Sequence, residues 1–339
     1  MTDYVLTLLG SADHPLPPEL IARMQKELSV TRLEWRAPPL ACDLYFSKAQ
    51  LLPLRPEAAA LNRLEQAVFY ALDTVALALS VAVGESDAVF LYPDRKENNV
   101  HPLEKSVQAS AEHAVEGLPF DAIVQPVDYR RKKLLICDMD STMITCECID
   151  ELADFVGKKA EVSSITERAM NGELQFEEAL RERVRLLAGL AESELQRCYE
   201  ERVKMSKGAK ELVQHMRKAG AHCVLVSGGF TFFTSRVAAE LGFHEHQGNV
   251  LEVVNGKLTG KVLAPILGKE AKLQALQEQC TRLGILPQEA LAIGDGANDL
   301  PMLLAAGLGV AYHAKPIVQR HARARLNYGS LDMLKWVVA

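Results

Sequence analysis

Two aspartates separated by one residue follow an apolar run near the middle of the chain. Residues 134–137 form the run, and Asp138 and Asp140 come directly after it. A short apolar run of this kind is typical of a buried parallel strand. Because side chains alternate along an extended chain, both carboxylates can point to the same side of the strand end, where open parallel sheets bind ligands. The pair is a candidate acid–base site, and a solvated loop is the alternative that the pair alone leaves open.

Two further apolar runs also end in polar residues. Residues 223–226 precede Ser-Gly-Gly at 227–229, and residues 291–293 precede Gly-Asp-Gly-Ala-Asn-Asp at 294–299. Together with Asp-Met-Asp-Ser-Thr at 138–142, these motifs resemble, in order, those of the haloacid dehalogenase superfamily of phosphotransferases. The resemblance implies an α/β fold with a Rossmann-like parallel sheet and an inserted helical cap.

Hydrolysis of a phosphate ester requires charge neutralisation, in-line positioning and protonation of the leaving oxygen. Asp138 would be the nucleophile and form an aspartyl-phosphate. Asp140 would be the general acid that protonates the departing hydroxyl, and then the base that activates water. One difficult displacement would thereby become two easier ones.

Oxygen ligands near these aspartates predict Mg²⁺ as the cofactor, since Mg²⁺ prefers octahedral oxygen coordination. Asp138, the backbone carbonyl of Asp140 and Asp295 could supply ligands. Asp299 is expected to orient other ligands. Asn298 could face the phosphate or hold a metal-bound water.

The Ser-Gly-Gly segment is a candidate phosphate site. Ser227 and the backbone N–H of Gly228 suit a phosphate oxygen, and a helix expected from Phe230 would present its positive end. A cation is also needed, and Lys269 and Lys272 precede the third motif. The spacing of the superfamily's lysine before its metal-binding acid selects Lys272.

A helical, charged pattern fills about 148–205, between the first and second core strands. Glycines at 157, 172 and 189 divide it into three or four short helices, which we interpret as the cap. The cap segments 166–172 and 176–184, together with the catalytic motifs, are similar to those of bacterial phosphoserine phosphatases.

This second resemblance implies roles for four residues around the cap. Glu147 would bind a substrate ammonium, and Arg183 would bind a carboxylate through its planar fork. Met170 and Phe176 would form an apolar lid. A surface ion pair for Arg183, and core packing for Met170 and Phe176, are the alternatives.

The resemblance implies Mg²⁺-dependent hydrolysis of O-phospho-L-serine to L-serine and phosphate, the last step of serine biosynthesis. One alternative is a related phosphatase or phosphotransferase that acts on another small phosphorylated metabolite. Another is an amino-acid-binding regulatory protein with an inactive phosphatase half. The complete set of motif residues argues against the latter.

The N-terminal region, 1–128, is predicted to be a separate α+β domain. Strands are expected at 4–9, 31–36, 41–46 and 122–127, with helices and a further strand between, in an order that suits a ferredoxin-like sandwich. The resemblance implies an ACT-like domain that binds a small molecule, and a scaffolding or dimerising domain without a ligand is the alternative. The basic run 130–133 would be a linker at the start of a phosphatase domain covering 129–339.

Composition limits the function further. The 339 residues are 48% hydrophobic, enough for the cores of two domains, and the net charge of −6 gives no reason to expect nucleic acid. The longest apolar run, 75–83, is too short to cross a bilayer, and no signal peptide is expected. Seven cysteines without zinc spacing predict reduced thiols. We expect a cytoplasmic enzyme for a small-molecule substrate, with no membrane partner and, from the family, a homodimer.

Overall fold

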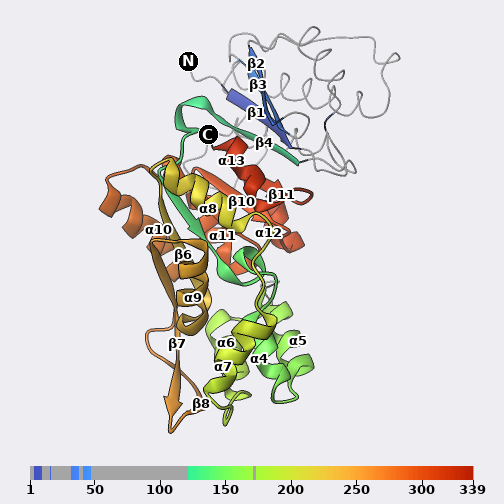
Figure 1. The fold of residues 1–339 in the computed structure, drawn as a ribbon, viewed down its shortest axis with the longest axis vertical. Coiled ribbons are helices and arrows are strands. Elements are labelled where there is room, and N and C mark those ends of the chain that lie inside the picture. The colour runs from blue at the N-terminus through green and yellow to red at the C-terminus, as the bar shows by residue number, and fades with distance from the viewer. Residues whose placement is uncertain are drawn as a thin grey trace, which may run out of the picture. The chain divides into compact units, whose positions relative to one another are not determined.

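The computed structural model describes residues 4–9, 16, 32–37, 41–46, 121–170 and 173–338. The chain divides into two compact units (Figure 1). The first consists of 1–131, 323–329 and 333–339, and the second of 132–322 and 330–332. The C-terminal segments thus group with the N-terminal unit, whereas the sequence prediction assigned them to the phosphatase domain.

The first unit contains a four-stranded antiparallel sheet in the order β2-β3-β1-β4. Its strands are β1 (Tyr4–Leu9), β2 (Arg32–Ala37), β3 (Ala41–Phe46) and β4 (Asp121–Pro126). All four were predicted to within one residue. The helices expected between them, and the strand expected at 88–91, lie outside the described residues, so the ACT-like domain stays a prediction.

C-terminal segments of the first unit are fixed to β4. This part of the chain forms β11 (Ala324–Leu326) and α13 (Leu334–Val337). The buried carboxylate of Asp121 accepts hydrogen bonds from the N–H groups of residues 327, 328 and 329, at 2.8, 2.9 and 3.1 Å. Sequence periodicity gives no signal for such long-range contacts.

The second unit is built on a sheet that runs in the order β10-β9-β5-β6-β7-β8. Its strands are β5 (Leu134–Cys137), β6 (His222–Phe230), β7 (Glu245–Val254), β8 (Lys257–Leu263), β9 (Ala290–Gly294) and β10 (Leu308–Tyr312). The pairs are parallel except for β7 with β8. The order reverses at β5, because β6 pairs with one side of it and β9 with the other. Ligands bind at such switch points in open α/β sheets.

Both faces of the central strands are covered, as their continuous apolar sequences predict. On one face, Ile136 and its neighbours pack with buried residues of α10 (Lys269–Leu283) and α11 (Leu300–Ala305). On the other, Cys223 of β6 contacts the carbonyl of Val213 in α8 (Ala209–Lys218). The remaining core helices are α9 (Thr231–Leu241) and α12 (Pro316–His321). The helix expected from Phe230 begins at Thr231, because Phe230 still belongs to β6.

Between β5 and α8, four α-helices are described in the segment predicted to form the cap. They are α4 (Cys148–Asp154), α5 (Lys159–Met170), α6 (Phe176–Arg185) and α7 (Ser193–Arg202). In Figure 1 they group beside the hairpin of β7 and β8, and backbone hydrogen bonds join Gly189 and Leu190 to Leu258 of β8. The turn of this hairpin is Asn255-Gly256, a pair typical of type I′ turns, and the two residues have φ of 51° and 73°, as that turn requires.

The apolar run 75–83 lies outside the described residues. Among the residues that the structure describes, no helix is both long enough and apolar enough to cross a bilayer. The cysteines whose side chains are described carry free thiols, as predicted.

Candidate active site

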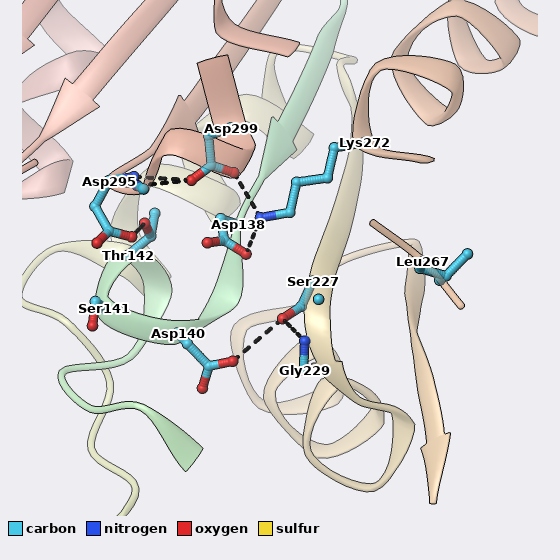
Figure 2. Close-up of polar contacts among 12 residues, drawn as sticks. Asp138, Asp140, Ser141, Thr142, Ser227, Gly229, Leu267, Lys272, Asp295 and Asp299 are labelled. Carbon is cyan, nitrogen blue, oxygen red and sulfur yellow. Dashed lines mark hydrogen bonds and ion pairs between the residues drawn. The ribbon is translucent and has the colours of Figure 1, made fainter. Parts of the chain in front are cut away.

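Strand register brings the polar motifs together. Cys137 of β5 pairs with Leu225 of β6 and with Ile293 of β9. Asp138 follows immediately, and its N–H donates to the carbonyl of Ile293 at 3.0 Å. Ser227 and Asp295 each lie two residues beyond the paired positions, so three strands deliver side chains to one edge of the sheet (Figure 2). The predicted constellation is present.

A buried lysine joins two of the aspartates. The Nζ of Lys272, which is 2% exposed, lies 2.7 Å from Oδ1 of Asp138 and 2.6 Å from Oδ1 of Asp299. The other carboxylate oxygen of Asp299 accepts the N–H groups of Asp295 and Gly296, at 3.2 and 3.0 Å. Asp299 therefore fixes both the lysine and the loop that carries Asp295, in keeping with the orienting role expected for it.

Asp140 is held between the catalytic loop and β6. Its Oδ1 accepts the N–H of Cys148 at 2.9 Å, and its Oδ2 accepts the hydroxyl of Ser227 at 3.3 Å. The Ser227 oxygen in turn accepts the N–H of Gly229 at 2.8 Å (Figure 2). The next residue, Ser141, has a φ of 54°, which turns the chain sharply after Asp140.

The electrostatics of the edge are dominated by burial and by like charges. Burial raises the pKa of Asp138 to about 7; the charge of Asp299 adds to the shift, and Lys272 opposes it. Burial, with the charges of Glu147 and Asp138, raises the pKa of Asp295 well above its usual value. Burial alone would lower the pKa of Lys272, but Asp138 and Asp299 raise it above the ordinary lysine value. The edge thus holds more carboxyl groups than its one lysine can neutralise, and their ionised forms are disfavoured until a further cation is present.

A metal ion could bind the carboxylates that Lys272 does not neutralise. Carboxylate oxygens of Asp138, Asp295 and Asp299 all lie within 4.8 Å of one another, and the residues are buried. Both Asp299 oxygens already bind Lys272 or loop N–H groups, so Asp138 and Asp295 are the more available ligands. Asp295 is oriented by the hydroxyl of Thr142, which donates to its Oδ1 at 3.0 Å. The donor set is entirely oxygen, which suits a hard divalent cation.

A cavity opens over this edge and is closed on its other side by the cap segment. The predicted site residues that line it are Asp138, Asp140, Glu147, Phe176, Arg183, Ser227, Gly228 and Asn298. Lys272 and Asp295 do not line the cavity. Lys272 pairs with Asp138, which does line it, and Asp295 accepts the hydroxyl of Thr142. Met170 is the last residue of α5, and its side chain lies outside the described residues.

Glu147 and Arg183 bring an acidic and a basic side chain to the cavity. Oε1 of Glu147 accepts the hydroxyl of Ser141 at 2.5 Å. Burial, with the charge of Asp140, raises the pKa of Glu147 to about 8. Arg183 is only 6% exposed, and among the described residues no carboxylate lies within ion-pairing distance of it. The alternative of a surface ion pair therefore does not describe Arg183.

Phe176 lies directly against the Ser-Gly-Gly motif at 227–229. A Cβ added at Gly228 would lie 2.5 Å from Cζ of Phe176, so a larger residue would displace the ring. Further lining residues were not predicted, namely Ile149, Thr166, Ala169, Leu180, Gly229 and Phe230. The hydroxyls of Thr166 and Thr142 form hydrogen bonds with Arg183 and Asp295, respectively. The local sequence around each threonine does not predict these partners.

Comparisons with known proteins agree with this geometry. Residues 135–304 match the model of the haloacid dehalogenase-like hydrolases. A phosphoserine phosphatase of Polaromonas sp. is 50% identical over 207 residues, which cover 60% of this chain and 88% of that protein. The structure of a substrate-bound phosphoserine phosphatase complex is 36% identical, with a TM-score of 0.58, over 60% of this chain and 97% of that one. The unliganded structure of a probable phosphoserine phosphatase from Vibrio cholerae is 27% identical, with a TM-score of 0.65, over 99% of this chain and 86% of that one.

Proposed function

The chain belongs to the haloacid dehalogenase-like hydrolases, and we propose that it is a phosphoserine phosphatase, releasing L-serine and inorganic phosphate from O-phospho-L-serine. One observation carries the choice of substrate. An acid, Glu147, and a base, Arg183, line the same cavity as Asp138. Phosphoserine presents an ammonium, a carboxylate and a phosphate, and the cavity offers a group suited to each.

In the first step, a carboxylate oxygen of Asp138 attacks phosphorus and the bond from phosphorus to the serine oxygen breaks. Asp140 gives its proton to that leaving oxygen. Burial raises the pKa of Asp140, which favours the protonated form that this step requires. The ion pair with Lys272 favours the ionised form of Asp138 and fixes one of its oxygens.

In the second step, water attacks the aspartyl-phosphate and transfers a proton to Asp140. The bond between phosphorus and the Asp138 oxygen breaks, and inorganic phosphate leaves. Asp140 is protonated again, and Asp138 is again a carboxylate, so the site is ready for another cycle. The hydrogen bonds from Cys148 and Ser227 keep Asp140 in place throughout.

Phosphate binding is assigned to the groups at the end of β6 and after β9. The hydroxyl of Ser227, the backbone N–H of Gly228 and the side chain of Asn298 would bind phosphoryl oxygens. The cofactor is proposed to be Mg²⁺, held by Asp138, the backbone carbonyl of Asp140 and Asp295. When bound, it would neutralise charge on the phosphoryl oxygens.

Substrate selection is assigned to the cap segment. Glu147 would bind the ammonium, and Arg183 would donate to both carboxylate oxygens. The ring of Phe176, together with Met170, would exclude water from the phosphoryl group. These roles are supported by the position of the described side chains around one cavity.

The domain organisation and the cellular setting of the protein complete the proposal. We assign 1–128 to an ACT-like domain, because the strand order β2-β3-β1-β4 is that of a ferredoxin-like sheet, and 129–339 to the phosphatase domain with its cap at about 148–205. We further propose a cytoplasmic homodimer that acts in the last step of serine biosynthesis.

Phosphate release from O-phospho-L-serine tests the proposal. The assay compares this ester with a panel of phosphorylated metabolites, with added Mg²⁺ and with EDTA. We expect selective, metal-dependent release from phosphoserine. Release from other esters only would retain Asp138 and Asp140 and reject the roles of Glu147 and Arg183. Transfer of phosphate to added alcohols, without hydrolysis, would favour a phosphotransferase.

A further inference from the structure

Arg183 is held by neutral oxygens on the protein side of the cavity. Its Nε donates to the carbonyl of Ala179 at 3.1 Å, one turn earlier in α6. Its Nη1 donates to the hydroxyl oxygen of Thr166 in α5 at 3.0 Å. A guanidinium has five N–H donors, and these contacts use two, which leaves three (5 − 2) on the terminal nitrogens for other partners.

Thr166 connects the arginine to an acid that does not touch it. The side chain is 2% exposed, in the interior of α5, and lines the cavity. Its hydroxyl lies 2.7 Å from Oδ1 of Asp150 in α4 and 3.1 Å from the carbonyl of Val162. A hydroxyl has one proton, and the closer, charged acceptor is Asp150. With that proton directed to Asp150, the lone pairs of Thr166 face the arginine.

We infer that Thr166 and Asp150 are positioning residues that set Arg183 for a substrate carboxylate, an inference that rests on the proposed function. Each member of the chain Asp150–Thr166–Arg183 comes from a different helix, namely α4, α5 and α6. The chain therefore fixes the guanidinium relative to the cap as a whole. Preorganisation of this kind lowers the ordering cost of binding.

Because the hydroxyl of Thr166 lies between them, Asp150 can help to orient Arg183 without forming a direct ion pair with it. A carboxylate in direct contact with Arg183 would take the bidentate fork that a substrate carboxylate needs. Asp150 instead orients the Thr166 dipole and leaves the terminal nitrogens available. The substrate carboxylate then becomes the first carboxylate in direct contact with a buried guanidinium.

Paired substrates test the inference in the full chain. O-phospho-L-serine and O-phosphoethanolamine share phosphate and ammonium, but only the first has a carboxylate. For Thr166→Val we expect kcat/KM for phosphoserine to fall about tenfold, through KM, since a charge-assisted contact is lost. The values for phosphoethanolamine and kcat for both esters should stay within about twofold. Thr166→Ser keeps the hydroxyl and should restore phosphoserine binding.

Control variants separate positioning from structural damage. Ser164→Ala changes an exposed hydroxyl on the same helix and should alter neither substrate. Asp150→Asn keeps an oxygen acceptor but removes the charge, so we expect the same selective KM effect at about threefold. Equal losses for both substrates in Thr166→Val, or no loss for either, would overturn the inference while leaving the proposed function intact. A wild-type protein that does not favour phosphoserine would overturn the proposed function and the inference together.

Discussion

The two sides of the cavity differ in how their polar groups are held. We define the sheet floor as Asp138, Asp140, Ser227, Lys272, Asp295 and Asp299, and the cap wall as Glu147, Phe176 and Arg183. All floor side chains except Lys272 follow one of three strands, whose register is fixed by hydrogen bonds. Lys272 comes from α10 and pairs with Asp138 and Asp299, and Ser227 donates to Asp140. Wall side chains come from the residue before α4 and from α6. Arg183 is held by contacts within the cap segment, whereas Glu147 accepts the hydroxyl of Ser141 and Phe176 lies against Gly228. The floor is thus specified mainly by strand register, whereas the wall depends on how individual side chains pack.

Charge compensation shows the same contrast. On the floor, Lys272 pairs with two carboxylates, and the remaining negative charge suits a metal ion. On the wall, Arg183 has no ion-pair partner among the described residues, and burial lowers its pKa. A buried charge without a partner is costly, so the wall gains most when an oppositely charged substrate arrives. Changes to the floor should therefore reduce kcat, and changes to the wall should raise KM.

The largest effect is expected on the floor, from Asp138→Asn. Loss of the nucleophile should reduce kcat for phosphoserine by a factor on the order of 10⁴ or more. Single-turnover assays with labelled phosphoserine should also detect no phosphorylated protein after acid quenching. Retention of full activity would mean that Asp138 is not the nucleophile.

Stability provides the control for this variant. The pKa of Asp138 is raised to about 7, above the value of an unfolded chain, so its ionised form opposes folding at neutral and higher pH. Asparagine removes that unfavourable charge but also removes one partner of Lys272. We expect the melting temperature of metal-free Asp138→Asn at pH 8 not to fall. A large decrease would show that the ion pair outweighs the burial of charge.

Asp140→Asn should have the next largest effect. Without a group that gives and takes a proton, both steps slow, and kcat should fall by about 10²- to 10⁴-fold. A substrate with a better leaving group, such as p-nitrophenyl phosphate, needs less protonation, so its first step should lose less. Equal losses with good and poor leaving groups would contradict the role of Asp140 as the general acid.

The floor could be predicted from sequence more completely than the wall. Each floor motif is local: an apolar strand ends and a polar residue follows, so parallel register alone brings Asp138, Ser227 and Asp295 to one edge. Lys272 lies on a helix, and periodicity gave no reason to prefer it to Lys269. The choice depended on the resemblance to the superfamily.

Long-range side-chain contacts account for what the sequence did not predict. Thr166 lies in a regular helix, and its contacts with Asp150 and Arg183 depend on how three helices pack. Thr142 was noted only as part of a motif, although its hydroxyl binds Asp295, 153 positions away in the chain. Helical periodicity predicts which face of a helix is buried but not which polar groups meet there.

On the wall, Arg183→Ala should act mainly through binding. We expect kcat/KM for phosphoserine to fall about 10²-fold and that for phosphoethanolamine to stay within about twofold, since only the first ester has a carboxylate. Arg183→Lys keeps a charge without the planar fork and should recover only part of the loss. Equal effects of Arg183→Ala on the two esters would assign Arg183 to cap packing instead of substrate recognition.

The smallest effect is expected from Glu147→Gln, which removes a charge but keeps the shape. KM for phosphoserine should rise about tenfold, while KM for glycolate 2-phosphate, which has a carboxylate and no amine, should change little.

The dependence of activity on pH gives a second test of Glu147. The pKa of Glu147 in the free protein is raised to about 8, so its negative charge appears as the pH rises from 7 to 8.5. An ionised Glu147 attracts the ammonium, and kcat/KM of the wild type for phosphoserine should therefore increase over that range, by roughly threefold. Ionisation of Asp138 also raises activity with pH, but this contribution is common to both esters and to both proteins. The part of the increase that depends on Glu147 should be missing for glycolate 2-phosphate and for Glu147→Gln, and identical profiles in all four measurements would contradict an ammonium-binding role for Glu147.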